Sequence, residues 1–417
     1  MPEPINADVI IAGAGMTGAT LGLALASAGL APVLVDPAPF DAQLAPTFDG
    51  RASAIAFASF RQWRALGLGE ALAPHAQRIE QILVTDGRRP GAASAGPGLA
   101  FLRFDAGEIA DRSQGEPLGY MLENRRIRAG LADAVAAAKL QVLAPARVTR
   151  AEFGPGAVEV TLAEGRVLRA PLVVGAEGRG SVVRGAAGIE AAGWSYRQAG
   201  VVATVALEMD HEGVAHEYFL PSGPFAILPL TERRASLVWT EPTRRGEALR
   251  TASDEAFHAH LRRRFGDFLG RVEAHGPRFV YPLSMQLASR LTGPRVALLG
   301  DAAHAIHPLA GQGLNLGLKD VAALAEVLVD AARLGEDIGS EAVLERYARW
   351  RRLDNIAVSL ACDSFNRLFS NDNPLLRLGR DAGMALVNRI GPARRFFMHE
   401  AGGALGDLPR LLRGQAL

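Results

Sequence analysis

Residues 8–36 read DVIIAGAGMTGATLGLALASAGLAPVLVD, and this stretch decides the fold. The apolar run Asp8–Ala12 leads into a glycine-rich turn, which is followed by the small and leucine-rich segment Met16–Ala28. A second apolar run begins at Pro32 and ends at Asp36. Short apolar runs predict strands, and the longer segment between them predicts a helix. The stretch is therefore expected to form a strand, a helix and a second strand.

The glycines of the turn are Gly13, Gly15 and Gly18, which is the spacing of a dinucleotide-binding turn. Gly13 permits a tight turn, Gly15 lets the backbone approach a pyrophosphate, and Gly18 lets the helix pack closely on the strand. Asp36 at the end of the second strand can accept a hydrogen bond from a ribose hydroxyl. Glycine-rich turns also occur in ordinary α/β folds, so the surrounding strand, helix and acid are what predict a dinucleotide site. They do not decide between FAD and NAD.

A second glycine-rich segment decides in favour of FAD. Residues 300–318 read GDAAHAIHPLAGQGLNLGL and follow another apolar run. Asp301 at the end of that strand can hold a ribityl hydroxyl, while Gly311, Gly313 and the amides after them form a helix N-terminus. Such an N-terminus stabilises an anion. Because a reduced flavin carries negative charge at N1 and O2, a helix end aimed there favours the reduced state.

The rest of the chain predicts an α/β fold with three parts. Helix and strand patterns alternate, except over 196–280, where strand-like stretches follow one another and indicate an antiparallel insert. We therefore expect a FAD-binding Rossmann-like domain with an inserted, mostly antiparallel substrate domain and a helical C-terminus. The expected boundaries are 1–75, 120–182 and 280–345 for the FAD-binding domain, 76–119 and 183–279 for the substrate domain, and 346–417 for the helical C-terminal region.

Composition excludes several classes of function. The chain has 417 residues, with 45 Lys and Arg against 44 Asp and Glu, so no strong positive field attracts nucleic acid. Its one cysteine, Cys362, excludes a disulfide framework and multi-cysteine metal sites. His304 and His307 lack a third ligand in the sequence, so no metal site is predicted. The uncharged run Val9–Val35 is interrupted by glycines and Pro32, which argues against a membrane span. The expected location is cytoplasmic, with peripheral contact at the inner membrane as an alternative.

The two glycine-rich segments, together with Asp49–Ala54 and Glu123–Arg125, resemble the FAD-dependent aromatic hydroxylases of the para-hydroxybenzoate hydroxylase type. The sequence is most similar to the ubiquinone-biosynthesis hydroxylases within that group, and the resemblance is strongest over Arg295–Val327. It implies a monooxygenase that hydroxylates the ring of a polyprenylated phenol through a flavin C4a-hydroperoxide formed with O2. A hydroxylase of soluble aromatics, an FAD-dependent prenyl reductase and a non-catalytic FAD-binding subunit are the alternatives.

The resemblance also implies roles for particular residues. Arg51 lies in the loop beside the flavin, and Arg125 contacts the FAD phosphate or ribityl region. Glu177 stands where the family has Asp, so it either touches FAD and helps to receive the nicotinamide donor or simply caps its turn. The expected catalytic residues are Arg51, Pro308, Gly311 and Gln312. The expected cofactor-binding residues are Gly13, Gly15, Thr17, Gly18, Asp36, Arg51, Arg125, Glu177, Asp301, Gly311, Gly313, Leu314 and Asn315.

The sequence leaves alternatives for the electron donor, for the residues that contact the substrate and for the partners of the protein. The chain has no second nicotinamide-binding turn, so NAD(P)H would bind transiently in the shared cleft; a ferredoxin-type donor is the other option. His216, Tyr218 or a backbone carbonyl would activate the phenol. The aromatic ring would stack on residues that core packing explains equally well, namely Trp239, Phe219, Phe225 and Pro229. The amphipathic segment Pro374–Phe397 forms a membrane or partner surface or else packs on the protein. A homo-oligomer and a ubiquinone-biosynthesis complex are the expected assemblies.

Overall fold

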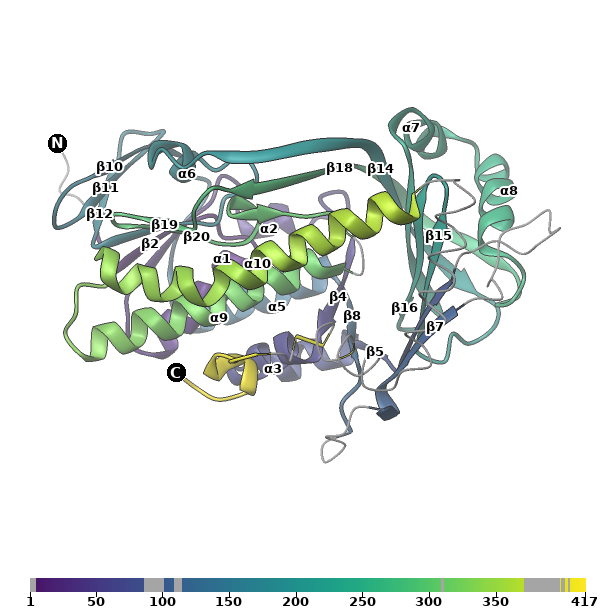
Figure 1. The fold of residues 1–417 in the computed structure, drawn as a ribbon, viewed down its shortest axis with the longest axis horizontal. Coiled ribbons are helices and arrows are strands. Elements are labelled where there is room, and N and C mark those ends of the chain that lie inside the picture. Colours follow the sequence, from purple (N-terminus) through teal and green to yellow (C-terminus); the bar gives the residue numbers. More distant parts are fainter. Residues whose placement is uncertain are drawn as a thin grey trace.

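The structure is a computed structural model that describes residues 5–85, 101–108, 115–308, 311–370, 398, 402–403 and 406–417. Its described part contains four sheets, and two of them position the site (Figure 1). A six-stranded sheet holds the N-terminal strands, and an eight-stranded sheet stands at the other end of the molecule (Figure 1). The long helix α10 (Glu341–Phe369) extends from the first sheet to the second (Figure 1).

The six-stranded sheet has the order β19-β20-β13-β2-β3-β9 and is parallel except at β19. Its strands are β19 (Thr292–Gly293), β20 (Val296–Leu298), β13 (Leu172–Gly175), β2 (Val9–Ala12), β3 (Pro32–Val35) and β9 (Gln141–Leu143). The central strands are apolar and buried at every position, which is typical of a parallel sheet covered on both faces. Three chain segments leave the carboxyl ends of β2, β13 and β20 side by side, and ligands bind at this edge in such sheets.

Helices pack against this sheet and against one another. Helix α1 (Met16–Ser27) contacts α5 (Asn124–Ala137) and α9 (Gln312–Arg333), and α9 in turn contacts α10. Helix α9 is buried along most of its length, so it is a core element of the molecule. The short helices are α2 (Phe40–Gln43), α3 (Phe57–Ala65), α4 (Gly69–Leu72) and α6 (Val182–Ala186), and 3-10 turns occupy Ala73–His75, Ala106–Glu108, Gly300–Ala302 and Arg410–Arg413.

The eight-stranded sheet has the order β21-β18-β14-β17-β16-β15-β6-β7 and is antiparallel except between β15 and β6. Its strands are β21 (His304–Ala305), β18 (Val272–Ala288), β14 (Ala191–Leu207), β17 (Arg234–Pro242), β16 (Gly223–Leu230), β15 (Val214–Leu220), β6 (Gln81–Thr85) and β7 (Phe101–Asp105). Strands β14 and β18 have 17 residues each and reach back toward the six-stranded sheet (Figure 1). Helices α7 (Thr243–Thr251) and α8 (Asp254–Phe265) lie on the side of the sheet away from α10 (Figure 1).

Two smaller sheets complete the described fold. One consists of β1 (Ile5–Asn6), β12 (Val167–Ala170), β11 (Val158–Leu162) and β10 (Val148–Phe153). The other consists of β4 (Ala52–Ala56), β8 (Gly119–Glu123) and β5 (Gln77–Ile79). The second sheet matters for the site because β4 directly follows Arg51 and lies beside the start of α9.

The predicted fold class is confirmed: a Rossmann-like unit, a largely antiparallel insert and a helical C-terminal region are all present. The segment Pro374–Phe397, proposed as an amphipathic surface, lies outside the described residues. Within the described ranges, no helix combines the length and the apolar character needed to cross a membrane.

Candidate active site

The first glycine turn has two glycines that packing requires and one that it does not. Gly13 has φ +101°, and a Cβ there would lie 2.3 Å from the carbonyl oxygen of Ala176. A Cβ on Gly18 would lie 1.9 Å from the carbonyl oxygen of Gly13. A Cβ on Gly15, by contrast, would meet no protein atom within 4 Å. Gly15 therefore keeps a space open that the protein itself does not fill.

Asp36 holds this turn in place. Its carboxylate accepts hydrogen bonds from the backbone N–H groups of Ala14, at 2.7 Å, and Ala38, at 2.8 Å. Burial raises the pKa of Asp36 above its ordinary value, although both backbone hydrogen bonds oppose that shift. The carboxylate thus supports the backbone that leads into α1.

A single cavity of about 1230 Å³ joins the two glycine-rich segments to the eight-stranded sheet. Nine of the fifteen residues predicted for the site line it: Gly15, Thr17, Arg51, Asp301, Pro308, Gly311, Gln312, Gly313 and Leu314. The other six, Gly13, Gly18, Asp36, Arg125, Glu177 and Asn315, do not. Segments almost 300 residues apart in the sequence therefore share one cavity wall.

Two helix N-termini open into this cavity. In α1 the first intrahelical hydrogen bond runs from Ala19 N–H to the Gly15 carbonyl, so the N–H groups of Met16 and Thr17 precede it. In α9, Gly311 is the N-cap residue with φ +64°, and Gly313 and Leu314 lie in the first turn. Each N-terminus carries a partial positive charge from the aligned peptide dipoles. The cavity thus offers two separate positions for anionic groups.

Asn315 fastens the second N-terminus to its neighbour. Its side-chain N–H donates to the Ala54 carbonyl at 2.8 Å, and its side-chain oxygen accepts from the Ala56 N–H at 2.9 Å. Both bonds join α9 to β4, and the side chain is buried. Asn315 therefore positions the cavity wall from behind.

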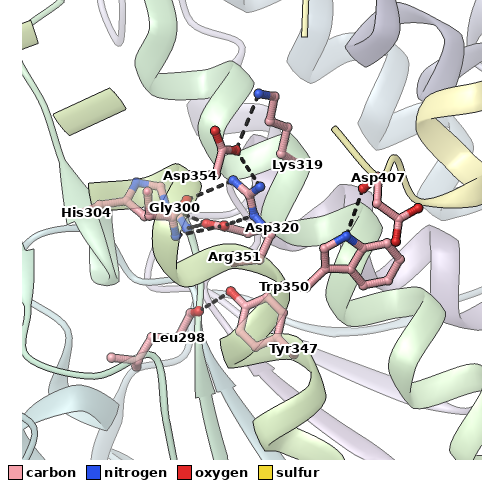
Figure 2. A network of polar contacts seen from close by, with 11 residues as sticks. Leu298, Gly300, His304, Lys319, Asp320, Tyr347, Trp350, Arg351, Asp354 and Asp407 are labelled. Atoms are coloured by element: carbon pink, nitrogen blue, oxygen red, sulfur yellow. Dashed lines mark hydrogen bonds and ion pairs between the residues drawn. The ribbon is translucent and has the colours of Figure 1, made fainter. Parts of the chain in front are cut away.

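A buried ionic cluster, which the sequence did not reveal, anchors the segment at Gly300. Asp320 of α9 accepts from His304 Nε2, from the Gly300 N–H at 3.2 Å and from Arg351 Nε at 2.9 Å. Figure 2 shows these groups converging from α9, α10 and the 300–304 segment, with Asp354 on the far side of the Arg351 guanidinium. Burial alone would raise the pKa of Asp320, but the charges and hydrogen bonds of His304 and Arg351 lower it to about 2.

Arg51 lines the cavity and belongs to a second polar cluster, which is centred on Asp49. Its guanidinium donates to both carboxylate oxygens of buried Asp49, at 2.8 and 3.0 Å, and stacks 4.8 Å above the Tyr281 ring. Asn124, at 3.0 Å, and Arg128, at 2.7 Å, also donate to Asp49. Burial opposes ionisation of Asp49, yet Arg51 and these two donors hold its pKa well below the ordinary value. Half of the Arg51 side chain remains exposed and can meet a ligand.

Glu177 and Arg125 lie beside the cavity and do not line it. One Glu177 oxygen accepts from the Ser181 hydroxyl at 2.6 Å and from the Val183 N–H at 3.0 Å, which are the contacts expected if this residue caps its turn. The neighbouring Arg179 lines the cavity instead. Arg125 is 3.5 Å from Glu123, whereas Arg128, one turn further along α5, lines the cavity. Family position alone could not separate these neighbours.

The opposite end of the cavity is the inner face of the eight-stranded sheet. Phe219 lines it, but Trp239 and Phe225 belong to the core cluster on the outer face, where their rings lie 5.7 Å apart. Tyr218 is fully buried in that same cluster. The core-packing interpretation therefore holds for Trp239 and Phe225, and Tyr218 is not a cavity residue.

The two histidines of the second segment are buried. His307 lines the cavity, its ring lies edge-on to Tyr196 at 5.2 Å, and burial lowers its pKa to about 4, so it is neutral at physiological pH. His304 is bonded to Asp320. Over the described ranges, no three His, Cys, Asp or Glu side chains are grouped so as to hold a metal ion.

Comparison with known proteins identifies the class of site. A family model for the FAD binding domain matches residues 6–358. The solved structure of p-nitrophenol 4-monooxygenase PnpA from Pseudomonas putida shares the fold, with a TM-score of 0.77, 20% identity, and coverage of 97% of this chain and 100% of that one. The chain thus belongs to the FAD binding domain family and has the fold of a flavin monooxygenase.

Two relatives narrow the class to a family. The chain is 46% identical to the ubiquinone hydroxylase UbiL of Rhodospirillum rubrum, over 99% of this chain and 94% of the relative. It is 36% identical to the 3-demethoxyubiquinol 3-hydroxylase of Escherichia coli, over 93% of this chain and 96% of the relative. The chain belongs to the FAD-dependent hydroxylases of ubiquinone biosynthesis, and the resemblance found in its motifs is confirmed.

The described residues fit FAD. The open space at Gly15, the α1 N-terminus beside it and the second N-terminus at α9 match a ligand with a central pyrophosphate and an electron-accepting ring system at one end. Asp301, whose side chain is half exposed, also lines the cavity and can accept hydrogen bonds from hydroxyl groups.

Proposed function

We propose that the chain hydroxylates the aromatic ring of a polyprenylated phenol during ubiquinone biosynthesis, with one atom of O2 entering the ring. The observation that carries this proposal is the single cavity that joins the FAD-binding segments to an apolar chamber at the eight-stranded sheet. The names of the two relatives support ubiquinone precursors as the substrates.

One wall of the cavity suits an isoprenoid chain. Helix α10 contributes one face to it, formed by Ala357, Val358, Ala361, Cys362, Phe365, Leu368 and Phe369. Phe365 and Leu368 are 41% and 38% exposed, so this wall continues to the surface. An apolar tail along this face would leave its aromatic ring between Phe219 and the second glycine segment.

Bound FAD would accept a hydride and then activate O2 for transfer to the ring. The chain would supply the surroundings for this chemistry. Gly15 and the α1 N-terminus would hold the pyrophosphate, and the α9 N-terminus would stabilise negative charge on the reduced ring system. Arg51, fixed by Asp49 and Tyr281, would meet the cofactor from the side. The apolar chamber would exclude water, which otherwise diverts activated oxygen to hydrogen peroxide.

The electron donor, the assemblies and the domain boundaries belong to the same proposal. NAD(P)H would bind transiently in the cavity, or a ferredoxin-type protein would deliver electrons. The exposed side chains Leu353, Ile356 and Leu360 on α10 support contact with a partner, a second copy or the inner membrane. The expected substrate-domain segment 76–119 is supported for β6 and β7, which belong to the eight-stranded sheet.

The test is a reconstitution. The protein with bound FAD is mixed with NADPH, NADH or reduced ferredoxin, with and without a prenylated phenol, and both flavin absorbance and hydroxylated product are followed. Faster flavin turnover with the phenol and formation of hydroxylated phenol are expected. Reduced flavin that reoxidises with the phenol present but yields only hydrogen peroxide for every prenylated phenol would contradict the proposal.

A further inference from the structure

Along β15, the side chains of His216 and Tyr218 lie on one face of the eight-stranded sheet and that of Glu217 lies on the other. Successive residues of a strand point to opposite faces of the sheet. The His216 ring packs 4.8 Å from Phe268, and Tyr218 lies in the same outer core cluster. Glu217 stands between them, so its side chain points the other way, toward the cavity that it lines.

Glu217 lies in the middle of an apolar row across the inner face of the sheet. In the strand register, Val84 of β6 is opposite Glu217 on one side and Ala226 of β16 is opposite it on the other. The row continues through Leu102 of β7, Val238 of β17 and Val202 of β14, and every member lines the cavity. Glu217 is the one carboxylate that the described strands of this sheet contribute to the cavity wall.

This carboxylate has no structural partner. The Glu217 side chain makes no hydrogen bond or ion pair with any residue of the described ranges, whereas the buried carboxylates Asp49 and Asp320 accept several hydrogen bonds each. A carboxylate in apolar surroundings without partners lowers the stability of the fold. Its presence is therefore better explained by a ligand than by folding.

We propose that Glu217 is the catalytic residue that accepts the proton of the substrate's phenolic hydroxyl. This inference rests on the proposed function and names the group that prepares the ring. The O–H bond of the phenol breaks, its proton bonds to a carboxylate oxygen of Glu217, and its electron pair stays on the ring oxygen. The resulting phenolate is more electron-rich at the carbon that receives oxygen. After that carbon has lost its own proton to water, Glu217 returns the first proton to the ring oxygen, and its charge is restored.

The acidity of Glu217 suits this role. Burial raises the pKa of Glu217 to about 8, closer to that of a phenol than the ordinary carboxyl value. Besides Glu217, the titratable or charged residues that line the cavity are Arg51, Arg128, Arg179, His216, Tyr281, Asp301, His307, Asp354 and Cys362. In the described part of the chain, none of them makes a hydrogen bond or ion pair with Glu217, so the pKa follows from burial alone.

The test compares the FAD-loaded wild type with Glu217→Gln, which keeps the shape of the side chain but cannot accept a proton. Glu217→Asp is the conservative variant, and Glu273→Gln on the exposed part of β18 is the control. With 2-prenylphenol as the probe, kcat/KM for hydroxylation in the wild type should rise with pH up to about 8, because only ionised Glu217 accepts the proton. Glu217→Gln should lose about a hundredfold in hydroxylation and lose this pH dependence, while donor oxidation continues with release of hydrogen peroxide. Glu217→Asp should recover part of the rate.

A binding measurement keeps this proposal distinct from the proposed function. The infrared band of the protonated Glu217 carboxyl group should disappear as the pH rises through about 8 in the wild type and in Glu273→Gln, should be missing in Glu217→Gln, and should shift when 2-prenylphenol binds. A band that disappears near the ordinary carboxyl pKa, a band that the phenol leaves unchanged, or an unchanged pH profile in Glu217→Gln would overturn the role of Glu217. If the phenol shifts the band but the wild type hydroxylates no prenylated phenol, the proposed function fails and the contact of Glu217 with the phenol stands.

Discussion

The glycines of the first turn predict opposite consequences for two substitutions that are chemically identical. In Gly15→Ala, the new methyl group meets no protein atom within 4 Å, and the backbone angles of φ −67° and ψ −174° suit alanine. The stability of the FAD-free protein should therefore be unchanged or higher by about 0.4–1 kcal/mol. In Gly18→Ala, the methyl group would lie 1.9 Å from the Gly13 carbonyl oxygen, so the backbone must move and the fold should lose about 1–3 kcal/mol or more.

The effect on FAD binding is reversed. The Gly15 methyl group would occupy the space through which a pyrophosphate reaches the N–H groups of Met16 and Thr17. Hydrogen bonds to a charged group are worth about 1.5–3 kcal/mol each, so losing one weakens FAD binding by about tenfold to a hundredfold. The Kd for FAD is measured by fluorescence titration of the FAD-free protein, and stability is measured by thermal unfolding of the same samples. Wild-type affinity in Gly15→Ala, or wild-type stability in Gly18→Ala, would refute this reading of the turn.

Three further experiments test buried groups around the cavity. Asp320→Asn should lower the free energy of unfolding by about 3–5 kcal/mol, because Arg351 loses its buried partner. The control Asp330→Asn, at a half-exposed ion pair, should lower it by less than about 1 kcal/mol. Equal losses in urea unfolding would count against a stabilising role of the buried cluster at Asp320. The pKa of Asp49 is held below the ordinary carboxyl value, so the stability that its ionised form contributes is present at neutral pH and is lost as the pH falls below about 4. Asp49→Asn should therefore make the free energy of unfolding less dependent on pH in the acid range, as measured by fluorescence-monitored unfolding. The same dependence on pH in the variant and the wild type would contradict this role of Asp49. Burial raises the pKa of Cys362 to about 11, so a thiol reagent should label it far more slowly at pH 8 in the native than in the unfolded protein, as mass spectrometry can determine.

The two glycine-rich segments could be found in the sequence because they depend on local backbone chemistry. The positive φ of Gly13 and Gly311 and the close approach at Gly18 are requirements of short chain segments, and they leave a spacing that can be read directly. Both segments follow strands, and because neighbouring parallel strands end at the same edge of the sheet, the segments lie close together in the structure. The same reasoning located the antiparallel insert, although not the 17-residue length of β14 and β18.

The substrate end could not be predicted in the same detail because it depends on strand register. A shift of one residue along β15 exchanges the faces of the sheet, so the choice among His216, Glu217 and Tyr218 needs the paired strands as well. The buried ionic cluster around Asp320 was missed for a related reason. Its partners Gly300, His304 and Arg351 are 16 to 31 residues away from Asp320 and meet it only when α9 and α10 pack together. For Glu177 the sequence left a cofactor contact and a capping role open, and the local contacts of its carboxylate with Ser181 and Val183 are those of a cap.

The cavity is expected to hold FAD and to be the place where a prenylated phenol is hydroxylated. The most direct measurement is the mass of the product formed by the FAD-loaded protein under isotopically labelled O2 in ordinary water, with a reduced donor and a short-chain prenylphenol. We predict a hydroxylated phenol that carries one labelled oxygen atom, and no such product when FAD is omitted. A product whose new oxygen comes from water, or the same yield without FAD, would contradict the account.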